Sequence, residues 1–333
     1  MDNLTHSLVG ALIGQAGLKR KTGLAMPALI IGANLPDVDA ACFFWLDGVE
    51  HLAFRRGITH GPPALVLLPL ILAGLLWAFD RWQAGRGQKR FGRPEGRLPV
   101  RFGWLYALSF IGCLTHPALD WLNVYGIRLL EPFSSRWFYG DTLFIIDVWL
   151  WGLMGFATWW SLRQEKRGGA WRRTGLLAIL AAMLYVNANY AISRLAASDL
   201  QDYGAEEVIA SPLPLAFWKR ELIVGGPMSD YSGQALVYQW SLFSNVSRVG
   251  DTIGQVDELL SCSDLDMLAR HDKQLAAFMF WSRAPVTVKS ADGSHFVYDA
   301  RFYDPRARDR FSVRYEPLNC YEATAEPRAL LDY

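Results

Sequence analysis

Residues 62–79 read PPALVLLPLILAGLLWAF and carry no charged side chain. Such a run approaches the roughly 20 apolar residues that a helix needs to cross the hydrocarbon core of a bilayer. Three further runs have the same character, at residues 102–119, 143–161 and 174–193. Their only charged or imidazole side chains are His116 and Asp147. The sequence therefore predicts a mainly α-helical protein built around a polytopic membrane bundle.

A less regular unit precedes these runs. Residues 4–18 are amphipathic and rich in glycine, and residues 24–35 form a short apolar run. We expect a helical hairpin that turns at residues 19–21 and packs against the bundle. Small residues let helix backbones approach closely, and three glycines are placed to do so: Gly10, Gly14 and Gly17.

Basic residues concentrate in two loops, at residues 80–101 and 162–173. The positive-inside rule predicts that both loops are cytoplasmic. Residues 36–61, residues 116–142 and everything after residue 193 then lie on the opposite, exterior side. Tryptophans near the ends of the runs are typical of the membrane–water interface, at Trp77, Trp82, Trp104, Trp159, Trp160 and Trp171.

The composition changes at about residue 194. Strand-like runs follow at residues 207–210, 217–224, 235–243, 286–289, 295–303 and 311–315. We expect one helix at residues 263–283, with Ser263 as its cap and Asp266 at the capping-box position, and a hairpin turn at residues 291–293. The predicted domains are therefore residues 1–193, embedded in the membrane, and residues 194–333, a small β-rich soluble α+β domain on the exterior side.

The overall charge narrows the class of partner. The 333 residues are 52% hydrophobic and 20% charged, with a net charge of +1. Without an excess of positive charge, nucleic acid is not expected as a partner, whereas membrane lipids are. Cys42 and Cys113 lie in apolar segments and are expected to pack as small hydrophobes. Cys262 and Cys320 can form a disulfide if their domain lies in an oxidising compartment.

Histidines and aspartates recur beside or within the apolar runs of the first 120 residues. Ionisable groups are costly there and mark candidate functional sites. Each also has an ordinary interpretation: Asp37 as a helix cap, and His116 and Asp120, one turn apart, as a hydrogen-bonded pair. The expected topology nevertheless brings most of the set to one end of the bundle. We predict a metal site formed by His6, Asp37, Asp39, His60, His116 and Asp120.

Neutral imidazoles and carboxylates suit Zn²⁺ or another first-row divalent ion. We expect one or two ions, with a metal-bound water as nucleophile. Asp37 and Asp39 follow Pro36 in an expected irregular turn, from which both can reach one centre and either can act as general base. Three threonines directly precede a histidine and are candidates to hydrogen-bond it: Thr5, Thr59 and Thr115.

Three arginines are expected on the same side, Arg55, Arg56 and Arg136. A phosphate-bearing substrate needs such groups to bind its oxygens, and we assign this role to Arg56. Interfacial arginines also anchor helices to lipid headgroups, which is the simpler interpretation. The participation of three further residues stays open: His51, Asp141 and Asp147.

Four motifs carry a resemblance to a known family. They are Asp2-x-x-Thr5-His6, Pro36-Asp37-x-Asp39, Arg56-Gly57-x-Thr59-His60 and His116-x-x-x-Asp120, and the stretch 120–147 is the most specific part. Over about residues 1–225 the sequence resembles the YdjM-like bacterial inner-membrane proteins. The resemblance implies a multi-pass protein of the cytoplasmic membrane with metal-dependent hydrolase activity.

The order of the predicted ligands is also similar, more weakly, to zinc-dependent phospholipase C and the single-strand nucleases. The His116-x-x-x-Asp120 pair is part of that similarity. A later His-x-x-x-Glu pair is missing here, so this similarity does not imply their full trinuclear site.

The favoured prediction is a membrane-bound metal-dependent hydrolase whose site opens at the exterior, periplasmic end of the bundle. Its expected substrate is a phosphoester or a lipid, because the site opens at headgroup level. The alternative is non-enzymatic, either a metal-binding membrane scaffold or a transporter. A transporter needs polar residues along the spans, whereas here they collect at one end, apart from Asp147, Asn187 and Asn189.

Overall fold

The computed structural model describes residues 1–87, 90–201, 207–224, 234–254, 265–303 and 311–316. The chain divides into two compact units. The first contains Met1–Asp39 and Arg56–Ala191, and the second contains Ala40–Arg55 and Ile192–Tyr333. Two contiguous domains were predicted, and the assignment of segment 40–55 to the C-terminal unit was not.

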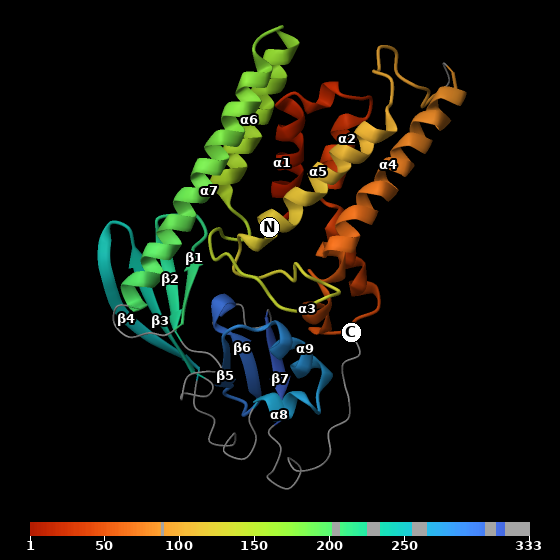
Figure 1. Cartoon of the computed structure of the whole chain (residues 1–333). Helices are drawn as coiled ribbons and strands as arrows, with labels where there is room; N and C mark the ends of the chain where they lie inside the picture. Colours follow the sequence, from red (N-terminus) through yellow and green to blue (C-terminus); the bar gives the residue numbers. More distant parts are fainter. Residues whose placement is uncertain (88–89, 202–206, 225–233, 255–264, 304–310, 317–333) are drawn as a thin grey trace. The chain divides into compact units, whose positions relative to one another are not determined.

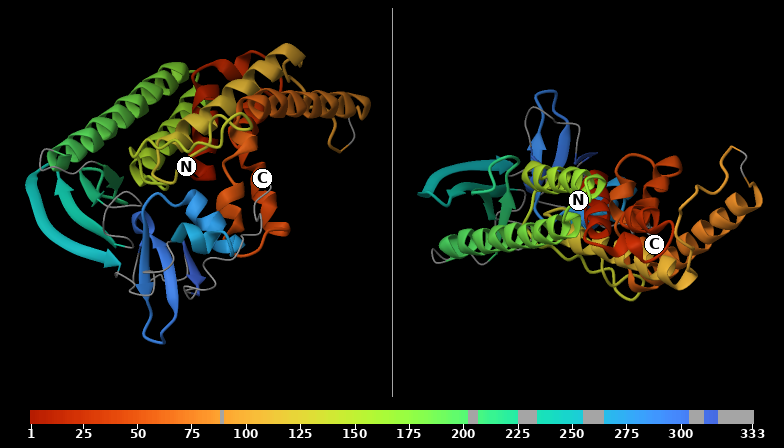
Figure 2. Two further views of the ribbon diagram at one scale, coloured as in Figure 1. Left: turned by 60° about the horizontal axis from the view of Figure 1, so that its bottom comes forward. Right: turned by 90° about the horizontal axis from the view of Figure 1, so that it is seen from above.

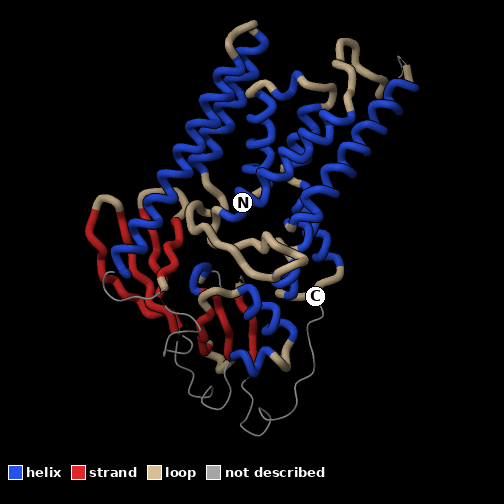
Figure 3. The backbone as a smooth tube through the Cα atoms, in the orientation of Figure 1, coloured by secondary structure: helices blue, strands red, loops and turns tan. Residues whose placement is uncertain are grey.

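The first unit is helical (Figures 1 and 3). Its elements are α1 (Asn3–Gln15), η1 (Leu18–Arg20), α2 (Ala25–Gly32), η3 (Ile58–His60), α4 (Pro62–Gly85), α5 (Phe102–Trp121), α6 (Val148–Lys166) and most of α7 (Trp171–Gln201). A 3₁₀ helix, η2 (Leu35–Phe44), begins in this unit and ends in the second.

Three helices are long and apolar enough to cross a membrane: α4, α5 and α7. The pair formed by α2 and η2, bent by 53°, also passes this test as a broken span or a re-entrant loop. Large apolar side chains of α4 and α7 are exposed, including Leu67, Ile71, Leu75, Leu177 and Leu184. Exposed apolar surface of this extent is typical of a lipid-facing helix.

The predicted run 143–161 does not form one helix. The chain at residues 143–147 is not helical, and α6 starts at Val148. Asp147 explains the late start, because its carboxylate accepts a hydrogen bond from Leu150 N and caps the helix. The helix α6 is not among the three that pass the test for a span.

The predicted hairpin at the N-terminus is confirmed, since α1 and α2 pack together. Its glycines allow close backbone contact. A Cβ at Gly10 would lie 2.7 Å from the carbonyl oxygen of Leu29, and one at Gly112 of α5 would lie 2.5 Å from the same oxygen. The backbone of α2 is thus in direct contact with both α1 and α5, which brings His6 and His116 onto neighbouring helices.

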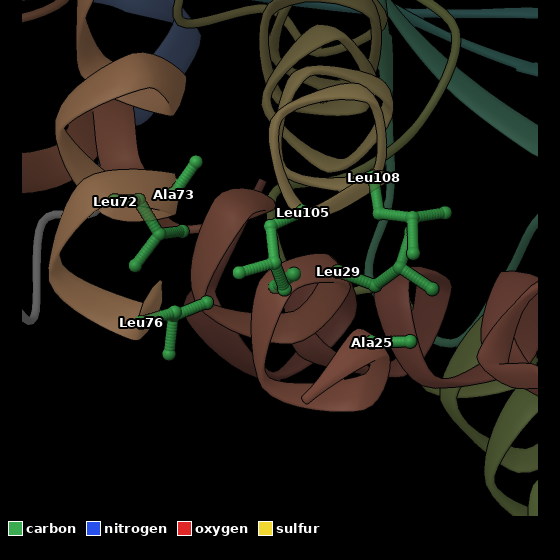
Figure 4. Close-up of a cluster of buried hydrophobic side chains, with 8 residues drawn as sticks. Ala25, Leu29, Leu72, Ala73, Leu76, Leu105 and Leu108 are labelled. Carbon is green, nitrogen blue, oxygen red and sulfur yellow. The ribbon is translucent and has the colours of Figure 1, made fainter. Parts of the chain in front are cut away.

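Two apolar clusters complete the packing of this unit. One joins α2, α4 and α5, and Figure 4 shows Leu29 of α2 beside Leu105 and Leu108 of α5. The other joins α1, α6 and α7, with Leu12, Leu150 and other buried side chains. Within a bilayer, such clusters stabilise the bundle through close van der Waals packing between the helices.

The loops at one end of this unit are tied together. Lys19 forms an ion pair with Glu165, and Gly23 N donates to Pro99 O at 3.2 Å. The turn between α1 and α2 therefore meets the two basic loops that follow α4 and α6 (Figures 1 and 2). His116, at the C-terminal end of α5, lies at the opposite end of that helix from this contact.

The second unit contains two antiparallel sheets among its described residues (Figure 3). Strands β1 (Val208–Pro212), β2 (Lys219–Val224), β3 (Gln234–Ser241) and β4 (Ser244–Gly254) form one sheet in chain order, and β5 (Pro285–Lys289), β6 (His295–Asp299) and β7 (Ser312–Tyr315) form the other. Its short helices are α3 (Glu50–Phe54), α8 (Leu265–Ala269), α9 (Lys273–Trp281) and η5 (Ala300–Phe302).

The predictions for this unit need three corrections. The single helix at residues 263–283 is wrong, because Asp272 caps a separate helix α9 by accepting from Gln274 N and Leu275 N; Ser263 lies outside the described residues. The strand predicted at residues 295–303 ends at Asp299. Strand β4 was not predicted, since its sequence is polar.

The cysteines follow their sequence context where the structure describes them. Cys42 and Cys113 are buried, as predicted. Cys262 and Cys320, whose pairing the sequence left open, lie outside the described residues.

Candidate metal centre

The last turns of α5 carry two donors of the candidate centre. His116 and Asp120 are four residues apart and lie on one helix face, with His116 Nε2 3.6 Å from Asp120 Oδ2. Both side chains are fully buried.

A helix end fixes the orientation of the His116 ring. Its Nδ1 lies 2.7 Å from the carbonyl oxygen of Ala33, the residue that caps α2. The last carbonyls of a helix have no partner within the helix. Because a carbonyl only accepts, Nδ1 carries the proton in this contact. The neutral ring then presents the lone pair of Nε2 to Asp120.

Two 3₁₀ helices bring further donors to this pair. Asp37 of η2 places Oδ1 3.8 Å from His116 Nε2, and His60 of η3 places Nε2 3.7 Å from Asp120 Oδ2. Asp37, His60 and His116 each offer one donor atom within 4.8 Å of the other two. Four ligands around Zn²⁺, each about 2.0–2.1 Å from the ion, lie about 3.4 Å apart. Three separations in this cluster are close to that spacing: 3.7 Å for His60 and Asp120, 3.6 Å for Asp120 and His116, and 3.8 Å for His116 and Asp37.

His6 of α1 lies at the other oxygen of Asp120. Its Nε2 is 3.4 Å from Asp120 Oδ1, which the amino group of Met1 also contacts. The rings of His6 and His116 are stacked, with centroids 3.8 Å apart and planes 16° from parallel. An imidazole binds a metal through a lone pair in its ring plane. Stacked rings do not direct these lone pairs at one point, so His6 and His116 do not serve the same ion in this arrangement, although their donor atoms are close.

Asp39 is outside both groups of candidate ligands found among the described residues. A 3₁₀ helix has about three residues per turn, so Asp37 and Asp39, two positions apart in η2, point in different directions. Asp39 Oδ2 accepts a hydrogen bond from Arg56 N at 2.7 Å and lies 3.6 Å from His60 Nδ1. The expected irregular turn is thus a 3₁₀ helix. Asp39 lies beside Nδ1 of His60, the nitrogen away from Asp120, whereas Asp37 lies beside Nε2 of His116.

Arg56 contacts protein acceptors. It is buried, with a positive φ of 55°, and its Nε lies 3.1 Å from Asp120 Oδ2. A second nitrogen donates to Asn123 Oδ1 at 3.1 Å and to Gly126 O at 3.2 Å. The guanidinium therefore balances the charge of Asp120, and it does not have the open arrangement expected of a phosphate clamp.

The three Thr-His pairs differ. Thr59 Oγ1 lies 2.9 Å from His60 Nδ1. Thr5 Oγ1 donates instead to Asp2, which caps α1, and Thr115 Oγ1 donates to Gly112 O of its own helix at 2.6 Å. The expected contact with the following histidine is therefore found at Thr59.

The two aspartates left open lie at the start of α6 and in the loop before it. Asp147 caps α6 and accepts hydrogen bonds from Tyr185 Oη at 3.0 and 3.2 Å. Asp141 is half-buried in the loop before α6, with a positive φ of 48°. Neither aspartate belongs to the two groups of candidate ligands.

The other basic candidates do not join these groups either. His51 and Arg55 belong to segment 40–55 of the second unit, where burial lowers the pKa of His51. Arg136 is exposed and stacks on Phe138, with its guanidinium carbon 5.6 Å from the ring centroid.

Two supporting residues were not predicted. Ala33 acts through its backbone carbonyl, for which the side-chain sequence gives no signal. Asn123 binds Arg56 and also accepts from Tyr125 N at 2.8 Å. Asn123 could have been found from its sequence position, because it is a polar residue three positions after Asp120.

The chemistry of the donors fits a divalent cation. The buried side-chain nitrogens that make no hydrogen bond within the described residues include His6 Nε2 and His116 Nε2 of this cluster. Leaving a buried polar atom unsatisfied costs about 1–3 kcal/mol, so each such atom needs an explanation. Imidazole nitrogens and carboxylate oxygens are ligands of Zn²⁺ and related ions.

Taken together, the apolar helices and the buried cluster define a helical membrane protein with a group of His and Asp residues able to hold a metal ion. The model of the YdjM inner membrane protein family matches residues 1–195. The match covers more than half of the 333 residues, and the chain belongs to this family. No curated protein and no solved structure matches the chain.

Proposed function

We propose that this protein is a metal-dependent hydrolase of the inner membrane. The observation that carries the proposal is the convergence of His60, His116, Asp37 and Asp120 from three separate segments, with spacings of 3.6–3.8 Å between neighbouring donors. A cation between these side chains would satisfy the buried Nε2 of His116, which makes no hydrogen bond within the described residues and is costly to leave unsatisfied.

The proposed chemistry divides between the metal and the chain. A bound Zn²⁺ or similar ion supplies a water with its pKa lowered towards about 7. His60, His116 and Asp120 would hold the ion. The side chain of Asp37 is 11% exposed whereas those of His116 and Asp120 are at most 1% exposed. Asp37 is therefore the donor best placed to meet water, as a ligand or as the general base that takes its proton.

The proposed substrate is a phosphoester or a lipid. His116 and Asp120 lie at the C-terminal end of an apolar helix, at the depth of the headgroups if α5 crosses the bilayer. Since Arg56 is bound to Asp120, it would balance the charge of that carboxylate and not bind the substrate.

The direct test is a metal assay joined to a substrate panel. The full chain, purified gently in detergent, is analysed for its elements and assayed on phosphodiester and lipid ester substrates. We expect at least one first-row divalent ion per chain, lost together with turnover in the double variant His116→Ala, Asp120→Ala. His271→Ala is the matched control, because this exposed histidine bonds Met267 O in α8. Metal below about a tenth of stoichiometric in the natural chain would overturn the proposal, and metal without turnover would favour a scaffold or a transporter.

The proposal includes a multi-pass topology with the metal centre on the periplasmic side. Support comes from the basic end of the first unit, where arginines stack on tryptophans. Arg81 lies over Trp77 and Arg86 over Trp82, with guanidinium carbons 5.4 and 4.2 Å from the ring centroids. Basic residues favour the cytoplasmic side, and tryptophans mark a membrane–water interface. A reporter fused after Ser193 should give a periplasmic signal, and a cytoplasmic signal would reverse this orientation.

A further inference from the structure

We propose that Thr59 and Asp39 are positioning residues that orient His60, with the ring held by a chain of two hydrogen bonds. The inference rests on the proposed metal centre, and it assigns Asp39 a role different from that of Asp37. Neither residue would bind the ion.

The direction of the chain follows from what each group can donate. Thr59 Oγ1 lies 2.9 Å from His60 Nδ1 and donates to Asp39 Oδ2 at 3.3 Å. A carboxylate only accepts, so the one hydroxyl proton of Thr59 belongs to the bond with Asp39. His60 Nδ1 must then carry the proton of the other bond. This tautomer leaves the lone pair on Nε2, the nitrogen that faces Asp120.

Asp39 is itself fixed, which gives the chain a rigid end. It is 4% exposed and accepts the backbone N–H of Arg56 at 2.7 Å. The side chain of the same residue, Arg56, forms an ion pair with Asp120. The orientation of His60 and the position of Asp120 therefore depend on the same short segment of backbone.

The matching arrangement at His116 uses a different partner. There Nδ1 donates to the backbone carbonyl of Ala33, and the preceding residue Thr115 bonds Gly112 O instead. Both imidazoles are thus held through Nδ1, but only at His60 does the hold depend on a side chain. Loss of such an outer hydrogen bond typically weakens metal binding by about 10–100-fold.

The test uses the full chain in detergent, titrated with Zn²⁺ against a chromophoric chelator. Thr59→Val removes the hydroxyl at constant shape and should weaken Zn²⁺ binding by about 10–100-fold without changing the stoichiometry. Asp39→Asn should also weaken Zn²⁺ binding. Thr59→Ser should restore the natural affinity, and Thr115→Val, the matched control, should leave it unchanged.

A spectroscopic readout separates positioning from general destabilisation. The visible bands of bound Co²⁺ should shift in Thr59→Val and stay constant in Thr115→Val. Equal Zn²⁺ affinities for Thr59→Val and Thr115→Val would overturn the proposed chain of hydrogen bonds. It would also be overturned if Asp39→Ala lost the ion as completely as Asp37→Ala. If the natural chain binds neither Zn²⁺ nor Co²⁺, the metal centre itself is refuted, and the assignment of Asp39 and Thr59 is refuted with it.

Discussion

The Nδ1 atom of His116 in α5 lies 2.7 Å from the carbonyl oxygen of Ala33 at the end of α2. This contact depends on the distance between two helix backbones. Glycines on both helices allow that distance, since a Cβ at Gly32 would lie 2.7 Å from Ser109 O and one at Gly112 would lie 2.5 Å from Leu29 O. The candidate metal centre should therefore be sensitive to the packing of α2 against α5, one helical turn before His116.

Substitution of Gly112 should separate α2 from α5. Gly112→Val places a side chain where backbone atoms already stand, so one helix must move and His116 loses its acceptor. We expect Zn²⁺ affinity to fall at least 10-fold, as for loss of an outer hydrogen bond, together with a lower melting temperature. Gly103→Val is the control in the same helix, because nothing lies within 4 Å of a Cβ there. Equal behaviour of the two variants would show that this glycine contact does not set the site.

Because the rings of His6 and His116 are stacked, we expect alanine substitutions of the two histidines to have different effects on metal content. His116→Ala should abolish binding of the ion held with His60 and Asp120. His6→Ala should keep at least one ion per chain, because its in-plane lone pair does not converge with that of His116. Elemental analysis of both variants checks this, and loss of all metal in each would mean that the two rings turn to share one ion.

The sequence was informative about the candidate site where chemistry marks the residue. His116 and Asp120 were predictable together, since ionisable side chains in an apolar run stand out and helical spacing places them on one face. The different roles of Asp37 and Asp39 were not predictable, because they depend on the 3₁₀ geometry of η2. Ala33 acts through its backbone carbonyl, which the amino-acid sequence does not indicate.

The fold shows the same division. The apolar runs predicted α4 and α5 because burial in lipid requires length and apolarity, both visible in sequence. The predicted helix 263–283 ran through Asp272, although an aspartate is a preferred helix cap and caps α9 here. The position of segment 40–55 was not predictable, since it depends on contacts with residues more than 200 positions away.

Those contacts centre on Gln274 of α9. Its Oε1 accepts from Val49 N at 2.7 Å, and its Nε2 donates to Asp47 O at 3.2 Å and to Glu50 Oε1 at 3.0 Å. Gln274→Ala removes the acceptor of the Val49 amide. Because a hydrogen bond contributes about 0.5–1.5 kcal/mol, amide exchange in peptides that contain Val49 should speed up by roughly 2–10-fold. Lys273→Ala, an exposed neighbour, should leave it unchanged; equal exchange in both variants would show that Gln274 does not hold this segment.

The second unit also contains a buried ion pair whose loss should destabilise it. Asp299 and Arg301 are both buried, with Asp299 Oδ1 2.7 Å from Arg301 Nε. Burial alone would raise the pKa of Asp299, but the Arg301 guanidinium and the hydrogen bonds from Arg301 and Ser282 outweigh it, so this pKa lies below its ordinary value. A lowered pKa means that the carboxylate stabilises the fold above the pKa of the unfolded chain, about 3.9, and that this contribution is lost as pH falls through the folded value.

Asp299→Asn should therefore destabilise the second unit by about 3–5 kcal/mol at neutral pH, because it leaves the Arg301 charge buried without its partner. In the natural chain, the stability contributed by this ion pair should not change with pH above about 5. Below about pH 4, the stability of the natural chain should approach that of Asp299→Asn. Hydrogen exchange of β6, measured on the whole protein in detergent at several pH values, follows both effects. Asp292→Asn in the exposed turn between β5 and β6 is the control, since its side-chain oxygen can still accept from Ser294 N. A variant Asp299→Asn as protected as this control at neutral pH would show that the ion pair adds no net stability.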